Sequence, residues 1–230
     1  MDLNSDLNQF LFGYYPYICL AVFFVGSLIR FDREQYTWKS DSSQLLRRGQ
    51  LWWGSNLFHV GVLGILAGHF TGFLTPIGVW HAIGISMPQK QMTAMVAGGL
   101  FGAMCTVGLG MLLARRLIDP RIRAVSSPMD VLILFLLLAQ VVLGLGGIPI
   151  SAQHPDGSEM LKFMRWAQRI ATFRGGAAEL VANVSIVFKL HIVLGLTLFL
   201  VFPFTRLVHV WSGFASVSYL LRPYQLMRRR

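Results

Sequence analysis

Charged residues are scarce in this sequence, and their scarcity argues against a soluble fold. Asp, Glu, Lys and Arg make up 13% of the 230 residues, whereas hydrophobic side chains make up 54%. An ordinary soluble domain carries about 25% charged residues. The composition therefore indicates a chain for which the lipid bilayer is the main solvent.

Acidic residues are scarcer than basic ones, and the formal net charge is +10. In a nucleic-acid-binding protein, the Lys and Arg side chains would gather on one polar face. Here they form short clusters between apolar runs, which is the pattern of the positive-inside rule. We therefore predict no nucleic-acid partner. The N-terminus also lacks the basic segment of a secretory signal, so the first apolar run is predicted to remain as a helix.

Cysteine is nearly absent, since only Cys19 and Cys105 occur. Each lies inside an apolar run, and neither belongs to a Cys-x-x-Cys or Cys-x-x-Cys-His motif. This spacing provides no set of ligands for an iron–sulfur cluster. We interpret both cysteines as packing residues.

Five apolar runs are long enough to cross a bilayer, which needs about 20 residues for a hydrocarbon layer of roughly 30 Å. The runs cover approximately residues 14–30, 53–75, 91–114, 130–150 and 189–209. Pro203 is predicted to kink the fifth run because proline removes a backbone donor. No repeat or soluble domain is recognisable, so residues 1–230 are predicted to form one all-α domain, a polytopic membrane bundle of five transmembrane helices.

The basic residues predict the orientation of this bundle. They are concentrated in the first loop, the third loop and the C-terminal tail, at Arg30, Arg33, Lys39, Arg47, Arg48, Arg115, Arg116, Arg121, Arg123, Arg222 and Arg228 to Arg230. The N-terminal segment has none, and the second loop has only Lys90. We therefore expect the N-terminus outside and the C-terminus in the cytoplasm. The fourth loop weakens this pattern because it carries four Lys and Arg residues, although it is long and contains three acidic residues.

Four of the six histidines lie in the predicted spans or at their ends, where an ionisable side chain is costly and indicates function. His59 and His69 are separated by about 15 Å along the second span, and His191 and His209 by about 27 Å along a regular fifth span. The two spans are antiparallel in the predicted topology. His59 and His209 therefore fall toward the cytoplasm, and His69 and His191 toward the outside.

Two imidazoles are the expected axial ligands of an electron-transferring haem, whereas structural zinc needs four ligands at one point. Two pairs at two depths therefore predict two b-type haems. The alternative for each histidine is an interhelical hydrogen bond. The two axial separations also differ, so tilt or the kink at Pro203 has to absorb the mismatch.

Other residues near these histidines have both a functional and an ordinary explanation. Gly61, Gly64, Gly68 and Gly72 could leave clearance for a porphyrin, although such spacing is more often helix packing. His81 and His154 lie in predicted outward loops, and we interpret them as solvated polar residues rather than ligands.

Several strings of the sequence resemble one known family. They are SNLFHVGVLGILAGHF at 55–70, SAQHPDGSEM at 151–160 and KLHIVLGLTLFLVFPFTRLVHVW at 189–211, with YPYI at 15–18 and QYTW at 35–38. They closely resemble the gamma subunit of membrane-bound respiratory nitrate reductase, over nearly the whole chain. The resemblance implies a dihaem cytochrome b that oxidises quinol and anchors a molybdenum-containing alpha subunit and an iron–sulfur beta subunit at the bacterial cytoplasmic membrane.

The resemblance also implies roles for individual residues. His59 and His209 would ligate the cytoplasm-side haem, and His69 and His191 the outer haem. Lys90 would bind quinol beside the outer haem, although a lysine that anchors a helix end at the interface is the alternative. Arg116 would pair with a haem propionate, or it would serve only as a positive-inside anchor.

The resemblance implies that electrons pass from quinol outside to the outer haem, the inner haem and an iron–sulfur partner. The basic loops and the C-terminal arm are the surfaces best able to meet that partner or anionic membrane lipids. Two rival functions keep some of these features. One is a cytochrome b anchor of another reductase, and the other is a non-redox anchor or transporter in which the histidines only form hydrogen bonds.

Overall fold

The protein is described from a computed structural model, which covers residues 3–34 and 48–212. These residues fold into helices, and no strand occurs among them. The all-α prediction is therefore confirmed for the described part of the chain. The QYTW string, Lys39, Arg47 and the arginines of the C-terminal tail lie outside the described residues.

Five helical segments are long and apolar enough to cross a membrane, as predicted. The first, Asn4–Arg33, combines α1 (Leu3–Gln9), a π-helical turn (Phe10–Tyr14) and α2 (Tyr15–Arg33). The others are α3 (Arg48–Leu74), α5 (Met87–Ile118), α7 (Pro128–Ala152) and the segment Ile186–Phe204, which contains α10 (Ile186–Val201). The first helix thus begins earlier than the prediction near residue 14, because polar residues continue it beyond the apolar run.

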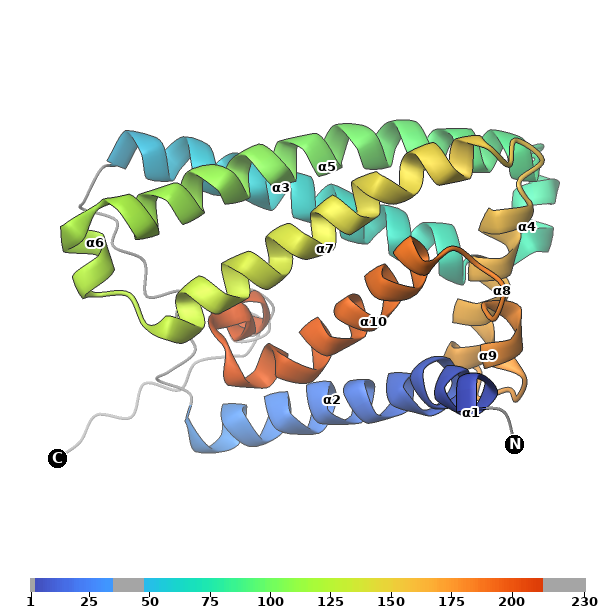
Figure 1. The fold of residues 1–230 in the computed structure, drawn as a ribbon, viewed down its shortest axis with the longest axis horizontal. Coiled ribbons are helices and arrows are strands. Elements are labelled where there is room, and N and C mark those ends of the chain that lie inside the picture. Colours follow the sequence, from blue (N-terminus) through green and yellow to red (C-terminus); the bar gives the residue numbers. More distant parts are fainter. Residues whose placement is uncertain (1–2, 35–47, 213–230) are drawn as a thin grey trace, which may run out of the picture.

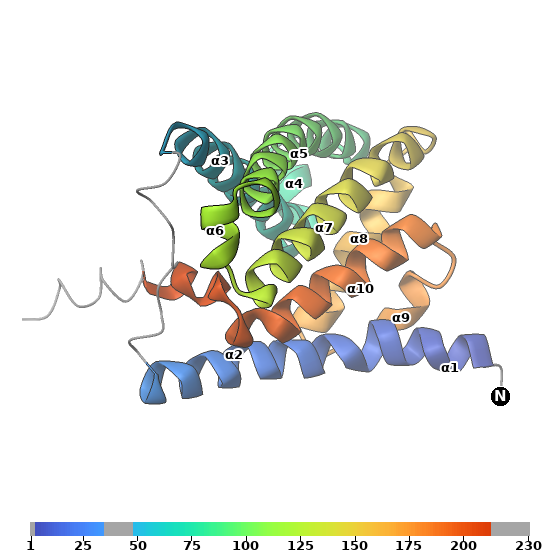
Figure 2. The same cartoon turned by 60° about the vertical axis from the view of Figure 1, so that its left-hand side comes forward.

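Contacts between the long helices run in the order α3, α5, α7, α10 and α2 (Figure 1). Three short helices, α4 (Ile77–Ala82), α8 (Ser158–Ala171) and α9 (Ala177–Leu180), lie at the end where α1 begins. Helix α6 (Pro120–Ala124) lies at the other end (Figure 2). These two ends are called the α8 end and the α6 end below.

The closest contact between long helices is that of α3 with α5. A Cβ atom added at Gly61 would lie 2.6 Å from the backbone nitrogen of Cys105, and one at Gly64 would lie 2.5 Å from the Phe101 ring. These two glycines therefore serve helix packing, which was the ordinary explanation of the glycine spacing. Cys105 is buried and free, as is Cys19, in agreement with their predicted packing role.

The fifth span was predicted to continue to residue 209 with a kink at Pro203, and this bound is wrong, because the spanning segment ends at Phe204. Helix α10 ends at Val201, a 3-10 turn covers Phe202–Phe204, and Thr205 is extended with φ −118° and ψ 176°. Pro203 lies in this break, where it has no backbone N–H to continue the helix. The guanidinium of Arg30 in α2 donates to the carbonyls of Pro203 and Thr205 at 2.6 and 2.9 Å. The break therefore replaces the kink, and the 27 Å separation calculated for a regular helix does not apply.

The fourth loop contains α8, which is joined to the ends of the long helices by side-chain hydrogen bonds. The Gln168 amide donates to the carbonyls of Phe73 and Thr75 at 3.0 and 3.1 Å, where α3 ends. The Trp166 indole donates to the Phe12 carbonyl at 3.0 Å. The Gln168 bonds satisfy carbonyls that the end of α3 leaves without a helical partner. Together with the Trp166 bond, they fix the α8 end of the bundle.

Candidate functional site

The structure brings the four histidines together in two pairs across α3 and the fifth span. The ring centroids of His69 and His191 are 6.1 Å apart, with an angle of 40° between the ring planes. Those of His59 and His209 are 6.2 Å apart, with an angle of 75°. His191 lies in α10, whereas His209 follows the short 3-10 helix Arg206–Val208 beyond the break.

All four imidazoles are held in the same way, through Nδ1. Each Nδ1 lies 2.6–3.1 Å from a backbone carbonyl oxygen. The acceptors for His59, His69, His191 and His209 are the carbonyls of Ser55, Ile65, Gln140 and Arg206, respectively. A carbonyl can only accept, so Nδ1 carries the hydrogen and Nε2 keeps its lone pair. This is the tautomer that a metal-ligating histidine needs.

The distance within each pair matches two imidazoles bound to one metal ion. A metal–nitrogen bond of about 2 Å and about 1.1 Å from that nitrogen to the ring centroid give roughly 6.3 Å between two opposed rings. The observed separations are 6.1 and 6.2 Å. No group of three or more His, Cys, Asp or Glu side chains suited to a metal occurs among residues 3–34 and 48–212. A haem macrocycle brings its own equatorial donors, so a pair of imidazoles is the donor set that it requires from protein.

His191 differs from the other three histidines because its Nδ1 partner belongs to a different helix. Its acceptor is the carbonyl of Gln140 in α7, and the Gln140 side-chain amide lies 3.4 Å from His191 Nε2. A Cβ atom added at Gly144, one turn further along α7, would lie 3.0 Å from His191 Cε1. Sequence analysis did not identify Gln140, although a polar residue within the most apolar span was a signal.

Lys90 does not lie in the second loop, where it was predicted, but in the first turn of α5. Ser86 caps this helix and forms a capping box with Gln89, so the helix begins before the apolar run. Lys90 is only 5% exposed, and its Nζ has no hydrogen-bond partner among the described residues. The centroid of the Trp80 ring lies 5.3 Å from Nζ, and a Cβ atom added at Gly72 of α3 would lie 3.8 Å from it.

Trp80 lies beside Lys90 at the α8 end, and Lys90, Trp80 and Gly72 together form a corner of the bundle. Its indole nitrogen is also buried, with no hydrogen-bond partner in the described part of the chain. Trp80 could not be predicted as a site residue, because a single aromatic residue in a predicted loop carries no functional signal. Gly72, one turn after His69, connects this corner to the His69/His191 pair.

Arg116 lies at the α6 end, as predicted, and is 7% exposed. Its Nη1 donates to Ser126 Oγ at 2.7 Å and to Asp130 Oδ2 at 3.4 Å. Asp130 also forms an ion pair with Arg206, with 3.0 Å between Oδ1 and Nε. Arg116 is therefore part of a charged network that sequence analysis did not foresee.

The remaining histidines stand apart from these pairs. His81 lies in α4 and His154 in the turn after α7, and both are exposed. The expectation that they are not ligands stays a prediction.

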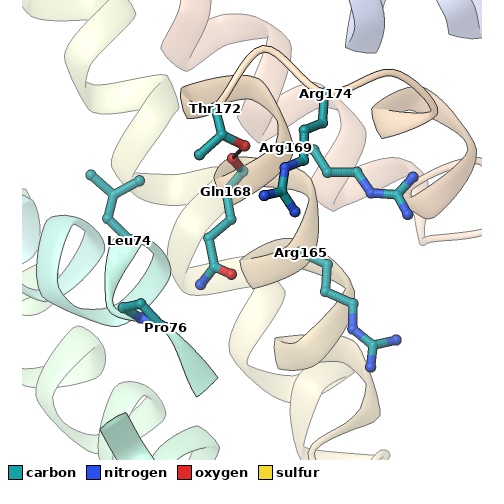
Figure 3. Close-up of a pocket in the computed structure, with 7 residues that line it drawn as sticks. All are labelled: Leu74, Pro76, Arg165, Gln168, Arg169, Thr172 and Arg174. Atoms are coloured by element: carbon teal, nitrogen blue, oxygen red, sulfur yellow. Dashed lines mark hydrogen bonds between the residues drawn. The ribbon is translucent and has the colours of Figure 1, made fainter. Parts of the chain in front are cut away.

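A separate hollow lies where α8 passes the end of α3 (Figure 3). Its volume is 380 Å³, and it contains none of the residues predicted for the site. Its lining consists of Leu74, Pro76, Arg165, Gln168, Arg169, Thr172 and Arg174. The arginines lie opposite the end of the apolar α3 span, as basic residues at a membrane interface do.

Comparison with known proteins agrees with this arrangement. Residues 8–230 match the family model described as nitrate reductase gamma subunit. The respiratory nitrate reductase 2 and 1 gamma chains of Escherichia coli (strain K12) are both 53% identical, over 225 and 224 residues. Each alignment covers 97% of this chain and 98% of the relative. The nitrate reductase gamma chain of Bacillus subtilis (strain 168) is 39% identical over 223 residues, which are 97% of this chain and 99% of the relative.

The match covers the first span from residue 8 onward, the other four spans completely and every histidine of the two pairs. Both the chain and the relatives are covered nearly from end to end, so the similarity concerns the whole subunit rather than a shared segment. The chain belongs to the nitrate reductase gamma subunit family.

Proposed function

We propose that this subunit is a dihaem cytochrome b that oxidises quinol and passes the electrons to an iron–sulfur beta subunit and a molybdenum-containing alpha subunit, where nitrate is reduced. The observation that carries the proposal is the pair of inter-ring distances, 6.1 and 6.2 Å, at two levels of the bundle. Hydrogen-bonding histidines would place a donor against an acceptor. Here the four Nδ1 donors already have carbonyl partners, which leaves the Nε2 lone pairs for metal binding. His191 Nε2 also lies 3.4 Å from the Gln140 side-chain amide, a long contact that a bound metal would replace.

His69 and His191 would hold one haem b, and His59 and His209 the other. A bound haem would supply one-electron redox chemistry, which no side chain of this subunit provides. The protein's part is to orient the imidazoles. It does so with the carbonyls of Ser55, Ile65 and Arg206 and, across helices, with that of Gln140. Such hydrogen bonds increase the basicity of the ligand nitrogen and fix the plane of the ring.

Lys90 and Trp80 would bind the quinol. An ammonium and an indole N–H that are buried without partners are costly unless a ligand oxygen pairs with them. Both groups lie at the α8 end, close to Gly72 and hence to the His69/His191 pair. An electron from quinol would therefore reach this pair of ligands first and the His59/His209 pair second.

The basic residues favour one orientation of the bundle in the bacterial cytoplasmic membrane. Arg115, Arg116, Arg121 and Arg123 lie at the α6 end, which by the positive-inside rule would face the cytoplasm. The α8 end, with the proposed quinol site, would then face outward. Protons from quinol would be released outside while electrons move inward, which costs about 2.3 kcal/mol for each electron per 100 mV and thereby conserves energy.

The test is a dithionite-reduced minus oxidised spectrum of the purified complex, with an assay of quinol-dependent nitrate reduction. We expect two haems b per gamma subunit and the co-purification of molybdenum. A protein without Soret absorption would refute the proposal and favour the non-redox anchor or transporter. Two haems without molybdenum or nitrate reduction would favour an anchor of another reductase.

Replacing Gly144 with alanine should disturb the His191 ring selectively. The new methyl group would lie 3.0 Å from Cε1, so the imidazole has to shift by a few tenths of an ångström. We expect a shift in the low-spin EPR signal of one haem while the signal of the other stays unchanged. Gly110→Ala is the matched control because its methyl group would meet nothing within 4 Å. Equal effects of both replacements would show that Gly144 does not act on His191.

A further inference from the structure

The segment that carries His209 lies outside the regular helices, so side chains of other elements have to hold it. Helix α10 ends at Val201, and the chain passes through an extended Thr205 before the turn Arg206–Val208. An irregular segment of this kind is not fixed by i to i−4 hydrogen bonds. The precise placement of the His209 ring therefore depends on tertiary contacts of the preceding residues.

Asp130, in the first turn of α7, makes the ion pair that holds this segment. Its Oδ1 lies 3.0 Å from Arg206 Nε, and its Oδ2 lies 3.4 Å from Arg116 Nη1. The three side chains are only 16%, 18% and 9% exposed, respectively. Water screens such a buried network less than a surface ion pair, so the loss of one partner has a larger effect.

Arg206 connects this ion pair to the ligand. Its backbone carbonyl accepts the hydrogen bond from His209 Nδ1 at 2.6 Å. Asp130 thus binds the side chain of Arg206, and the backbone carbonyl of Arg206 orients the His209 imidazole. Movement of Arg206 would rotate or shift the His209 ring.

We propose that Asp130 is a positioning residue for His209, acting through Arg206 to set the orientation of the imidazole in the His59/His209 pair. This inference rests on the proposed function, in which that pair ligates a haem. The carboxylate also places a negative charge near that ligand, which stabilises the oxidised form of the bound haem. Asp130 would therefore affect both the ring geometry and the reduction potential at the α6 end.

Asp130 has a second structural role that the experiment has to separate from the first. It forms a capping box with Ser127, in which Ser127 Oγ accepts from the Asp130 amide and Asp130 Oδ2 accepts from the Ser127 amide. Loss of such a cap destabilises the first turn of the helix. Ser127→Ala weakens this cap without touching Arg206, so it is the matched control.

The experiment compares Asp130→Asn and Ser127→Ala with the wild type in the membrane-bound complex. Asparagine keeps an oxygen that can accept from the Ser127 amide, but it has no charge to pair with Arg206. The EPR signal of a low-spin haem with two histidines depends on the angle between the imidazole planes, which is 75° in this pair. We expect Asp130→Asn to shift the signal and raise the midpoint potential of the His59/His209 haem only. Ser127→Ala should leave both haems unchanged.

The outcomes separate this inference from the proposed function. A wild type without two distinct haem signals would overturn the proposed function itself. A wild type with two signals, neither of which changes in Asp130→Asn, would overturn the positioning role. The same shift in Ser127→Ala would assign Asp130 to the helix cap alone. If Asp130→Asn fails to assemble, Arg206→Gln breaks the same ion pair and must shift the same haem, and unchanged signals in that variant would also overturn the positioning role.

Discussion

Replacing His69 or His191 with alanine is expected to remove one of the two haems and to leave the other in place. The ring centroids of this pair are 6.1 Å apart, and in the proposed function each ring would be one of two axial ligands. The His59/His209 pair is built from separate residues and keeps its own contacts. The haem content, measured by the pyridine haemochrome method, should fall by half in either variant. Quinol-dependent nitrate reduction should be abolished because the electron path is interrupted.

Exposed histidines outside the pairs provide the control for this result. His81→Ala and His154→Ala should retain both haems, since these exposed side chains belong to neither pair. The reciprocal variants, His59→Ala and His209→Ala, should lose the other haem. An unaltered spectrum in both His69→Ala and His191→Ala would refute the pairing.

Replacing Lys90 with methionine should weaken quinol binding while both haems remain. Methionine preserves most of the length and apolar volume of the side chain but removes the ammonium group. A hydrogen bond to a charged group contributes about 1.5–3 kcal/mol, which corresponds to a loss of about 10- to 100-fold in affinity. A quinol-analogue inhibitor should therefore bind about 10- to 100-fold more weakly, as measured by titration of the haem spectrum.

Protein stability distinguishes this role from a structural one. The Lys90 ammonium is buried without a partner among the described residues, so its removal relieves an uncompensated cost. We expect the thermal unfolding temperature of Lys90→Met to equal or exceed that of the wild type. Lys162→Met is the control for the removal of a paired ammonium, because Lys162 at the same end forms an ion pair with Glu159 at 2.6 Å. Unchanged inhibitor affinity in Lys90→Met would exclude Lys90 from the quinol site.

The sequence by itself determined the membrane helices and the positions of His59 and His69 along α3. An apolar run of about 20 residues has one stable conformation in lipid, because only a helix satisfies all its backbone hydrogen bonds internally. The five spans could therefore be predicted from composition and length. His59 and His69 also kept their predicted places, because α3 is regular throughout and its rise per residue is fixed.

Where local sequence signals compete, only the tertiary structure decided which conformation forms. Pro203 predicted a kink, but the end of α10 at Val201 also depends on the Arg30 guanidinium, which binds the carbonyls that the break leaves free. Lys90 was placed in a loop because a charged residue ends an apolar run, whereas the Ser86 cap and the corner formed with Trp80 place it inside the first turn of α5.

The contacts around the histidine rings likewise could not be predicted from the sequence. Gln140 and Asp130 lie in α7, far along the chain from the residues that they contact, and no periodicity connects them with His191 or Arg206. Helix formation depends on neighbours within four residues and on the solvent, so the sequence determines it. The placement of a histidine ring depends on which helices pack side by side, and that was decided by the tertiary structure alone.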